Sequence, residues 1–189
     1  MDYLANISDF QPENEQEESD KRLILQFAQW HPDSVLSREN ETAHITSSGF
    51  ILNDTLDRAL MARHNIRGVW AWPGGHADGD TDLYAVALRE AREETGAVSL
   101  RPISKDIASL DILTVRGHWK RGRYVSAHLH LSVAYIFVCD EGDALRVKPD
   151  ENSAVAWMDT ALITSEHFSD SDVYLYNKLI RRARAIWNS

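Results

Sequence analysis

The chain has 189 residues, of which 43% are hydrophobic and 26% charged, and its formal net charge at pH 7 is −9. These values indicate one folded domain with a sizeable core, and the negative charge argues against binding to nucleic-acid polymers or anionic membranes. A lone Cys139 excludes an internal disulfide. No signal segment and no apolar run of the ~18 residues that span a bilayer occur, so we expect a cytoplasmic protein.

The N-terminal part, residues 1–37, is polar and then helical. A helix is predicted between residues 13 and 30, and we expect it to pack as an N-terminal extension on the edge of the domain formed by residues 38–189. The two parts would make one compact unit. The alternative is that this helix contributes to a homodimer. Its predicted apolar stripe is Leu23, Phe27 and Trp30.

Strands and helices alternate along the remaining chain. Strands are predicted over residues 43–52, 56–64, 69–72, 107–119, 128–138 and 155–158. Helices are predicted over residues 83–95, near 160–165, and over 170–187. This order predicts an α/β fold, with a mixed sheet between helices in an α/β/α sandwich. In the last helix, the apolar stripe is Val173, Tyr176, Ile180, Ala183 and Trp187, and three arginines (Arg181, Arg182 and Arg184) suit the helix dipole.

The helix over residues 83–95 carries the clearest chemistry. Asp80, Thr81 or Asp82 can cap its start, and Gly96 can end it. One face is apolar and then acidic: Leu83, Val86, Ala87, Glu90, Glu93 and Glu94. Clustered carboxylates repel unless a cation lies among them, and a hard cation such as Mg²⁺ prefers oxygen ligands. Arg89, one turn from Glu93, would pair with one carboxylate. A solvated acidic helix end is the alternative.

The spacing from Gly75 to Ala97 matches a longer pattern, which comprises Gly75, Arg89, Glu90, Ala91, Glu93, Glu94, Gly96 and Ala97. It resembles the Nudix box, with Thr81 in place of the first Glu. The resemblance implies a Nudix-type sandwich and a Mg²⁺- or Mn²⁺-dependent pyrophosphohydrolase. Its substrate would be a small phosphorylated compound, such as a nucleoside diphosphate linked to another group, cleaved at a phosphoanhydride bond.

The same resemblance implies roles for particular residues. Glu90, Glu93 and Glu94 would hold the metal, and Arg89 would orient them. Glu151 lies in a loop where many family members carry a catalytic Glu, and it is the candidate general base beside the box glutamates. Solvation of an ordinary acidic turn is the alternative for Glu151.

Four of the eight histidines also occupy suggestive places: His44, His76, His128 and His130. Imidazole is a common ligand for Zn²⁺ and similar ions, and two histidines two positions apart on a strand point to the same side. A second, histidine-ligated divalent metal, or a phosphate site, is therefore a hypothesis. For each histidine alone, a partly exposed polar residue is the alternative.

The histidine positions resemble those of isopentenyl diphosphate isomerase, which shares the Nudix fold. That enzyme has a catalytic Cys directly before its Gly-His, where this chain has Gly74 before Gly75-His76. A non-hydrolytic, isomerase-like enzyme is thus one rival function. A non-catalytic, ligand-binding regulator derived from the Nudix fold is another.

Aromatic and basic residues near the box suggest a substrate pocket. Stacking of a base on an indole contributes roughly 1–3 kcal/mol, so Trp72 or Trp70 could hold a nucleobase, although core packing explains them equally well. A basic turn is the candidate site for a distal phosphate, and a solvated turn is its alternative. The turn residues are Arg116, Lys120, Arg121 and Arg123.

Overall fold

The computed structural model describes residues 2–66, 68–120 and 122–187, so Arg121 of the predicted basic turn lies outside the described residues. The helices are α1 (Tyr3–Asp9), α2 (Glu15–Trp30), α3 (Leu83–Thr95), the short 3-10 helix η1 (Thr160–Leu162) and α4 (Asp170–Trp187). The strands are β1 (Ala43–Leu52), β2 (Arg58–His64), β3 (Trp70–Ala71), β4 (Gly74–His76), β5 (Arg101–Pro102), β6 (Ser109–Val115), β7 (His118–Lys120), β8 (Arg123–Val125), β9 (His128–Val138) and β10 (Asn152–Asp159).

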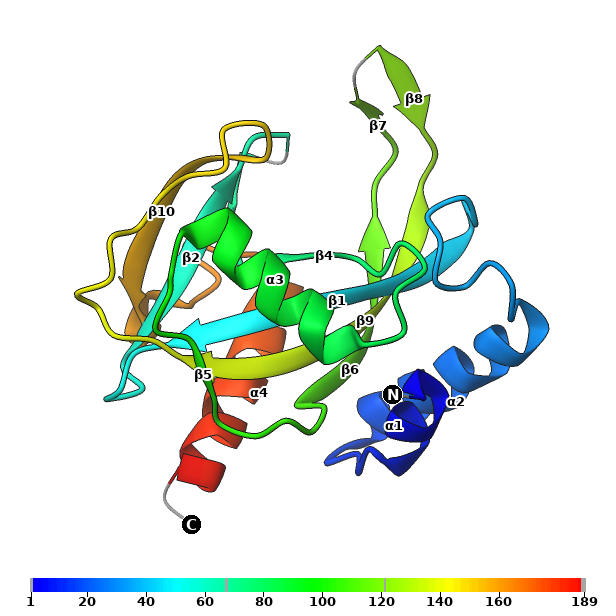
Figure 1. Ribbon diagram of the computed structural model, residues 1–189, viewed down its shortest axis with the longest axis horizontal. Coiled ribbons are helices and arrows are strands. Elements are labelled where there is room, and N and C mark those ends of the chain that lie inside the picture. The colour runs from blue at the N-terminus through cyan, green and yellow to red at the C-terminus, as the bar shows by residue number, and fades with distance from the viewer. Residues whose placement is uncertain (1, 67, 121, 188–189) are drawn as a thin grey trace.

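A mixed sheet forms the centre of the molecule, with the strand order β10-β2-β1-β9-β5 (Figure 1). Strands β1 and β9 run parallel, in a register that pairs Ala43 with Leu129 and Leu52 with Val138. Strands β3, β4 and β6 pair with β2, β1 and β9, each in antiparallel fashion. Strands β7 and β8 form a separate hairpin that projects from the sheet.

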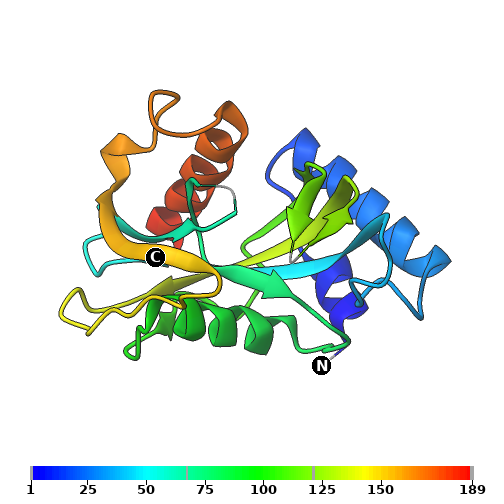
Figure 2. The same cartoon turned by 90° about the horizontal axis from the view of Figure 1, so that it is seen from above.

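Helices cover both faces of this sheet (Figure 2). On one face, the Ser47 hydroxyl of β1 donates a 2.6 Å hydrogen bond to the Leu83 carbonyl of α3. On the other face, Phe50 of β1 stacks on Tyr176 of α4, with ring centroids 5.6 Å apart. Strand β1 is buried along its whole length because both of its faces are covered. The predicted α/β/α sandwich is therefore confirmed.

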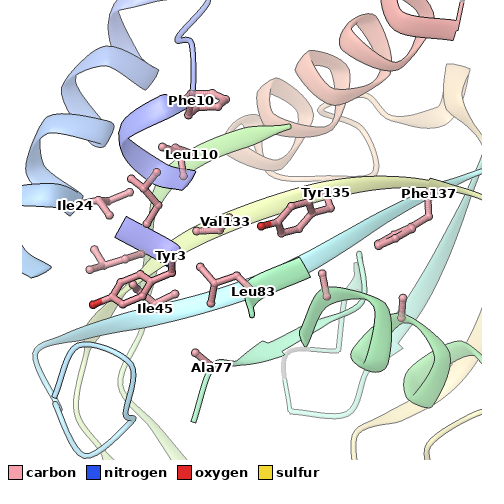
Figure 3. Close-up of a cluster of buried hydrophobic side chains, with 14 of the residues drawn as sticks. Tyr3, Phe10, Ile24, Ile45, Ala77, Leu83, Leu110, Val133, Tyr135 and Phe137 are labelled. Atoms are coloured by element: carbon pink, nitrogen blue, oxygen red, sulfur yellow. The ribbon is translucent and has the colours of Figure 1, made fainter. Parts of the chain in front are cut away.

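The N-terminal helices pack into the main core. Tyr3 and Phe10, within and directly after α1, join Ile24 of α2 in a buried cluster with Ile45 of β1 and Val133 of β9 (Figure 3). Helix α1 is absent from the predicted elements; its start is capped by Asp2, whose carboxylate accepts a 3.0 Å bond from the Leu4 amide. Seven residues are too few for apolar periodicity to identify a helix.

The predicted apolar stripe of α2 is wrong for two of its three residues, since only Phe27 packs against the core. Trp30 and Leu23 are 66% and 39% exposed, whereas Glu17, Ile24 and Ala28 are buried. The buried face of α2 includes the carboxylate of Glu17. A prediction that looks only for apolar residues at helical spacing therefore selects the neighbouring face. Glu17 is accommodated because cations from α4 meet it in the core.

Those cations form a buried ion network between α2, α4 and β6. Both Nη atoms of Arg182 donate to the Glu17 carboxylate, at 3.0 and 3.1 Å, and Lys178 Nζ lies 2.7 Å from Asp111 and 3.1 Å from Glu17. Burial alone would raise the pKa of Glu17, but the hydrogen bonds and charges of its partners hold it below the usual value. Arg182 is thus a core residue, held by its carboxylate partners as well as by its place near the end of the helix.

Two strand boundaries also differ from the prediction. The strand expected over residues 107–119 is interrupted after Val115, and β7 begins a new hairpin at His118. Strand β2 begins at Arg58 because Leu56 has a left-handed backbone, with φ of 56°, inside a turn. None of the helices in the described part of the chain has the length and apolar character needed to cross a bilayer.

Candidate active site and histidine cluster

Helix α3 is fixed at both ends by its capping residues. Of the three predicted caps, Asp82 is the one used, and its carboxylate accepts a 3.0 Å bond from the Ala85 amide. Gly96 ends the helix with φ of 75°. Glu90 and Glu94 lie one turn apart on this helix, and both face β4.

Three carboxylates converge beside β4, and we call Glu90, Glu94 and Glu151 the acidic cluster. One oxygen from each lies within 4.8 Å of the other two. Glu94 is 6% exposed and accepts a 2.8 Å hydrogen bond from the Gly74 amide. A Cβ at Gly75 would lie 2.5 Å from Cδ and 2.8 Å from Oε1 of Glu90, so a side chain at this position would displace the Glu90 carboxylate.

The loop that carries Glu151 is tied to α3. The Asn152 side chain donates a 2.9 Å hydrogen bond to the Glu94 carbonyl, which connects this loop to the end of the helix. Glu151 therefore reaches the cluster from a segment 57 positions after Glu94, and the structure brings together three of the predicted site carboxylates.

Glu93 and Arg89 lie at the rim of this cluster. The Glu93 side chain is 46% exposed, and its oxygen lies 3.0 Å from Lys148 Nζ. Arg89 lies 3.6 Å from Asp80 and 3.7 Å from Glu90. The expected pairing of Arg89 with Glu93 is therefore replaced by contacts to the helix start and to the cluster itself.

Lys148 is a site residue that the sequence did not reveal. Its Nζ lies 3.0 Å from Glu93, 3.1 Å from Glu151 and 4.0 Å from Glu90, so it bridges the carboxylates. Burial would lower the pKa of Lys148, but its bonds to Glu93 and Glu151 raise it overall. A single lysine in a loop carries no pattern, and only its place two residues before Asp150-Glu151 could have drawn attention to it.

The acidic cluster has the properties of a site for a hard divalent cation. Burial raises the pKa of Glu94 to about 8, against the opposing hydrogen bond from Gly74, and burial also raises the pKa of Glu90. Carboxylates that are buried together in this way gain from a cation, and an all-oxygen donor set suits Mg²⁺ or Mn²⁺. The residues present therefore fit the metal that the Nudix resemblance implies.

Replacing Lys148, which bridges the carboxylates, should alter the affinity of the acidic cluster for a metal ion. We expect Lys148→Met to bind Mn²⁺ about fivefold more tightly, because Lys148 competes for the same carboxylates and a partly exposed ion pair contributes roughly 1 kcal/mol. Calorimetric titration with Mn²⁺ measures this change, with Lys105→Met, an exposed lysine, as the matched control. An unchanged or weaker affinity in Lys148→Met would contradict the bridging role.

The raised pKa of Glu94 predicts how the stability of the metal-free protein varies with pH. Between the ordinary value of 4.5 and about 8, the folded state retains a proton that the unfolded state has released, so this group makes folding less favourable as pH rises. In EDTA, the Tm of the parent should therefore fall relative to that of Glu94→Gln from pH 5 to pH 8. Comparing the two proteins cancels the contributions of the histidines, and parallel Tm curves would rule this behaviour out.

The four predicted histidines gather in a second place, the histidine cluster of His44, His76, His128 and His130. His44 and His130 are direct partners in the β1–β9 pair, and His76 of β4 pairs with Thr46 of β1. These residues lie on the sheet face opposite α3, because side chains alternate along β1 and Ser47 faces α3. Ligand nitrogens of His44, His76 and His130 lie within 4.8 Å of one another.

Desolvation lowers the pKa of two members of this cluster, the buried His44 and the half-buried His76. For His76, desolvation lowers the pKa to about 3, with further lowering by the charges of Arg38 and His44. Neutral imidazoles present nitrogen lone pairs, which a metal ion or a donor group can use.

The predicted aromatic and basic substrate residues lie apart from the acidic cluster. Trp72 packs against Phe50 and Tyr176, with ring centroids 6.4 and 5.8 Å apart, on the α4 side of the sheet. This position favours the core-packing interpretation of Trp72. Arg123 is exposed on β8, opposite Lys120 in the projecting hairpin. The hairpin adjoins the histidine cluster along the chain, because β8 ends at Val125 and β9 begins at His128.

Comparisons with known proteins agree with the fold described above. The chain matches the family model for the NUDIX domain over residues 42–177. Similar solved structures include an Ap4A hydrolase binary complex from C. elegans, with 16% identity, a TM-score of 0.51, and coverage of 76% of this chain and 97% of that one. A NUDIX-family hydrolase from Clostridium perfringens has 17% identity, a TM-score of 0.52, and coverage of 73% and 96%.

A MutT protein from Methanosarcina mazei Go1 has 22% identity, a TM-score of 0.50, and coverage of 77% of this chain and 96% of that one. No sequence among the curated proteins is significantly similar to this chain. At these identities the structural matches establish the fold, while the family model spans more than half of the chain and includes the acidic cluster. The chain therefore belongs to the NUDIX domain family, and this membership supports the predicted pyrophosphohydrolase.

Proposed function

We propose that this chain hydrolyses a phosphoanhydride bond in a small diphosphate-containing substrate, with Mg²⁺ or Mn²⁺ bound at the acidic cluster. The observation that carries the proposal is the convergence of Glu90, Glu94 and Glu151 beside the backbone of β4. Three carboxylates within 4.8 Å are poorly suited to a neutral ligand and well suited to a cation that a phosphate also contacts.

The ligand residues have distinct supports. Glu94 accepts a hydrogen bond from the Gly74 amide, and Glu90 lies 3.7 Å from Arg89. A bound divalent ion would supply charge neutralisation for the phosphoryl oxygens, which become more negative at the transition state. Glu93 remains a proposed ligand. It lies at the rim of the acidic cluster, and Lys148 Nζ lies between its carboxylate and those of Glu90 and Glu151.

Glu151 is the proposed general base. Its side chain is 40% exposed, so water can reach it, while its oxygen still lies in the acidic cluster. A base must lie within hydrogen-bond reach of the attacking water, and a half-exposed loop carboxylate meets that need better than the buried Glu94. A cation held by the carboxylates would take the place of Lys148 among them, and the Lys148 ammonium would then be available to a phosphate oxygen.

The structure weighs against both rival functions. A side chain at position 74, where the isomerase pattern has its catalytic Cys, would place a Cβ 2.2 Å from Ser48 Oγ and 2.9 Å from its Cα. A regulator without turnover has little use for buried carboxylates that repel one another. The hydrolase is therefore favoured over the isomerase-like enzyme and over the regulator.

The remaining parts of the proposal concern assembly and location. A cytoplasmic protein agrees with the single Cys139, which is buried and whose thiol pKa burial raises to about 11. A homodimer is proposed as the usual arrangement of soluble oligomers. Analytical ultracentrifugation at micromolar concentration would test it, and a mass of 21.5 kDa in solution would show a monomer.

A substrate panel tests the function. The panel should include nucleoside triphosphates, nucleotide sugars and, because one structural neighbour is an Ap4A hydrolase, dinucleoside polyphosphates. We expect turnover with Mg²⁺ or Mn²⁺ that EDTA abolishes, and hydrolysis in ¹⁸O-water would label the phosphorus that is attacked. Absence of turnover on the whole panel, with Mn²⁺ bound, would count against the proposed substrate class.

A further inference from the structure

His44 presents a buried lone pair to the centre of the histidine cluster. Its Nδ1 lies 2.9 Å from the Asn40 carbonyl, which can only accept, so the proton is on Nδ1 and the lone pair is on Nε2. This Nε2 is buried and has no hydrogen-bond partner in the described part of the chain. A buried polar atom without a partner is uncommon and needs a cause, and an ion that uses this lone pair would provide one.

His128 is oriented in the same way from the neighbouring strand. Its Nδ1 lies 2.8 Å from the Ser126 carbonyl, so its lone pair is also on Nε2, and this atom lies 3.3 Å from Nε2 of His130. Two nitrogens bound to one tetrahedral zinc at about 2.0–2.1 Å lie about 3.3–3.4 Å apart. The two rings of β9 already have the spacing of one edge of such a site.

Strands distant in sequence complete the arrangement. His44 comes from β1, His76 from β4 and His130 from β9, and their ring centroids are 5.0 to 5.2 Å apart. The carboxylate of Asp78, whose charge acts on His76, is engaged by a bidentate contact with Arg38. The nearby donors are therefore predominantly imidazole nitrogens, a set that suits zinc better than magnesium.

We propose that His44, His76 and His130, whose ligand nitrogens lie within 4.8 Å of one another, bind one transition-metal ion of the zinc class at a site separate from the acidic cluster. His128, whose Nε2 lies 3.3 Å from that of His130, is the fourth ligand of this proposal. The carbonyls of Asn40 and Ser126 are the outer hydrogen-bond partners that orient ligand rings in metal sites of this kind. Strand β4 lies between the two sites. At Gly75 the strand faces Glu90 of α3, and the next residue, His76, points to the opposite face of the sheet. This inference goes beyond the proposed hydrolysis and does not depend on it.

The test uses the full chain without a polyhistidine tag, stripped with a chelator and then given Zn²⁺ or Co²⁺ in the absence of Mg²⁺. We expect one ion per chain by mass spectrometry of the metal, and an intense visible Co²⁺ spectrum typical of tetrahedral nitrogen ligands. His130→Gln should weaken zinc binding by more than about a hundredfold, since even loss of an outer partner costs 10–100-fold. His167→Gln, an exposed histidine outside the cluster, is the matched control.

Glu94→Gln separates this inference from the proposed function. It should lower turnover and weaken Mn²⁺ binding but leave the affinity for the zinc-class ion unchanged. Zinc that is retained in His130→Gln and His76→Gln, or lost in Glu94→Gln, would place the ion at the acidic cluster and overturn the inference. Should the histidine variants fail to fold, X-ray absorption at the zinc edge of the parent decides, because oxygen-only ligation or no bound zinc would also overturn it.

Discussion

Glu94→Gln is expected to lower kcat by at least about a hundredfold on the best substrate of the panel, with a smaller change in KM. Glu94 is the most buried carboxylate of the acidic cluster, and the Gly74 amide holds it in place. Gln keeps the shape and an oxygen acceptor but removes the negative charge, so the metal is bound more weakly and the transition-state charge is less well neutralised. Steady-state kinetics at saturating Mg²⁺ measure the effect.

Two variants serve as comparisons for this result. Glu166→Gln changes an exposed glutamate outside the site and should leave kcat unaltered. Glu93→Gln should lose less activity than Glu94→Gln, because its side chain is 46% exposed and contacts the cluster through Lys148. Retention of more than about a tenth of the parent kcat in Glu94→Gln would disprove the assignment of the metal to the acidic cluster.

Lys178→Met should destabilise the protein by about 3–5 kcal/mol, the usual cost of removing one partner from a buried ion pair. Met fills nearly the same volume, so the loss is electrostatic: Asp111 loses its 2.7 Å cation contact, and Glu17 loses one of two. Both carboxylates are almost fully buried and cannot regain hydration. Urea unfolding measures the free energy of unfolding.

A surface ion pair provides the control for this experiment. Arg101 lies 2.5 Å from Asp54, but the two side chains are 59% and 54% exposed. Arg101→Met should therefore change the free energy of unfolding by no more than about 1 kcal/mol. Equal losses in the two variants would show that the buried network contributes no more than a solvated pair.

Much of the fold could be predicted because local and long-range signals agree. Helix α3 has the predicted bounds, since good helix formers lie between a capping Asp82 and a terminating Gly96. Strands β1 and β9 also have the predicted bounds, because each is an apolar run long enough to cross the centre of a covered sheet. His44, His128 and His130 gather because they lie at the start of β1 and β9, and His76 joins them from β4, which pairs with β1.

The features that the sequence did not reveal depend on charged residues far apart along the chain. Glu17 and Arg182 are 165 positions apart, and hydrophobic patterning assigns both to solvent. Lys148 enters the acidic cluster from a loop, with no periodicity to indicate it. In each case the partner of opposite charge makes burial tolerable, and no property of the residue alone identifies that partner.

The buried position of Glu17 bears on how the protein can be shortened. The family match begins at residue 42, and a chain trimmed to start near there would keep every residue of the acidic cluster. It would also leave Arg182 without the carboxylate that its guanidinium contacts, and would uncover the apolar cluster around Ile45 and Val133. The smallest autonomous folding unit is therefore larger than the segment that defines the family, and truncation at the family boundary should yield insoluble protein.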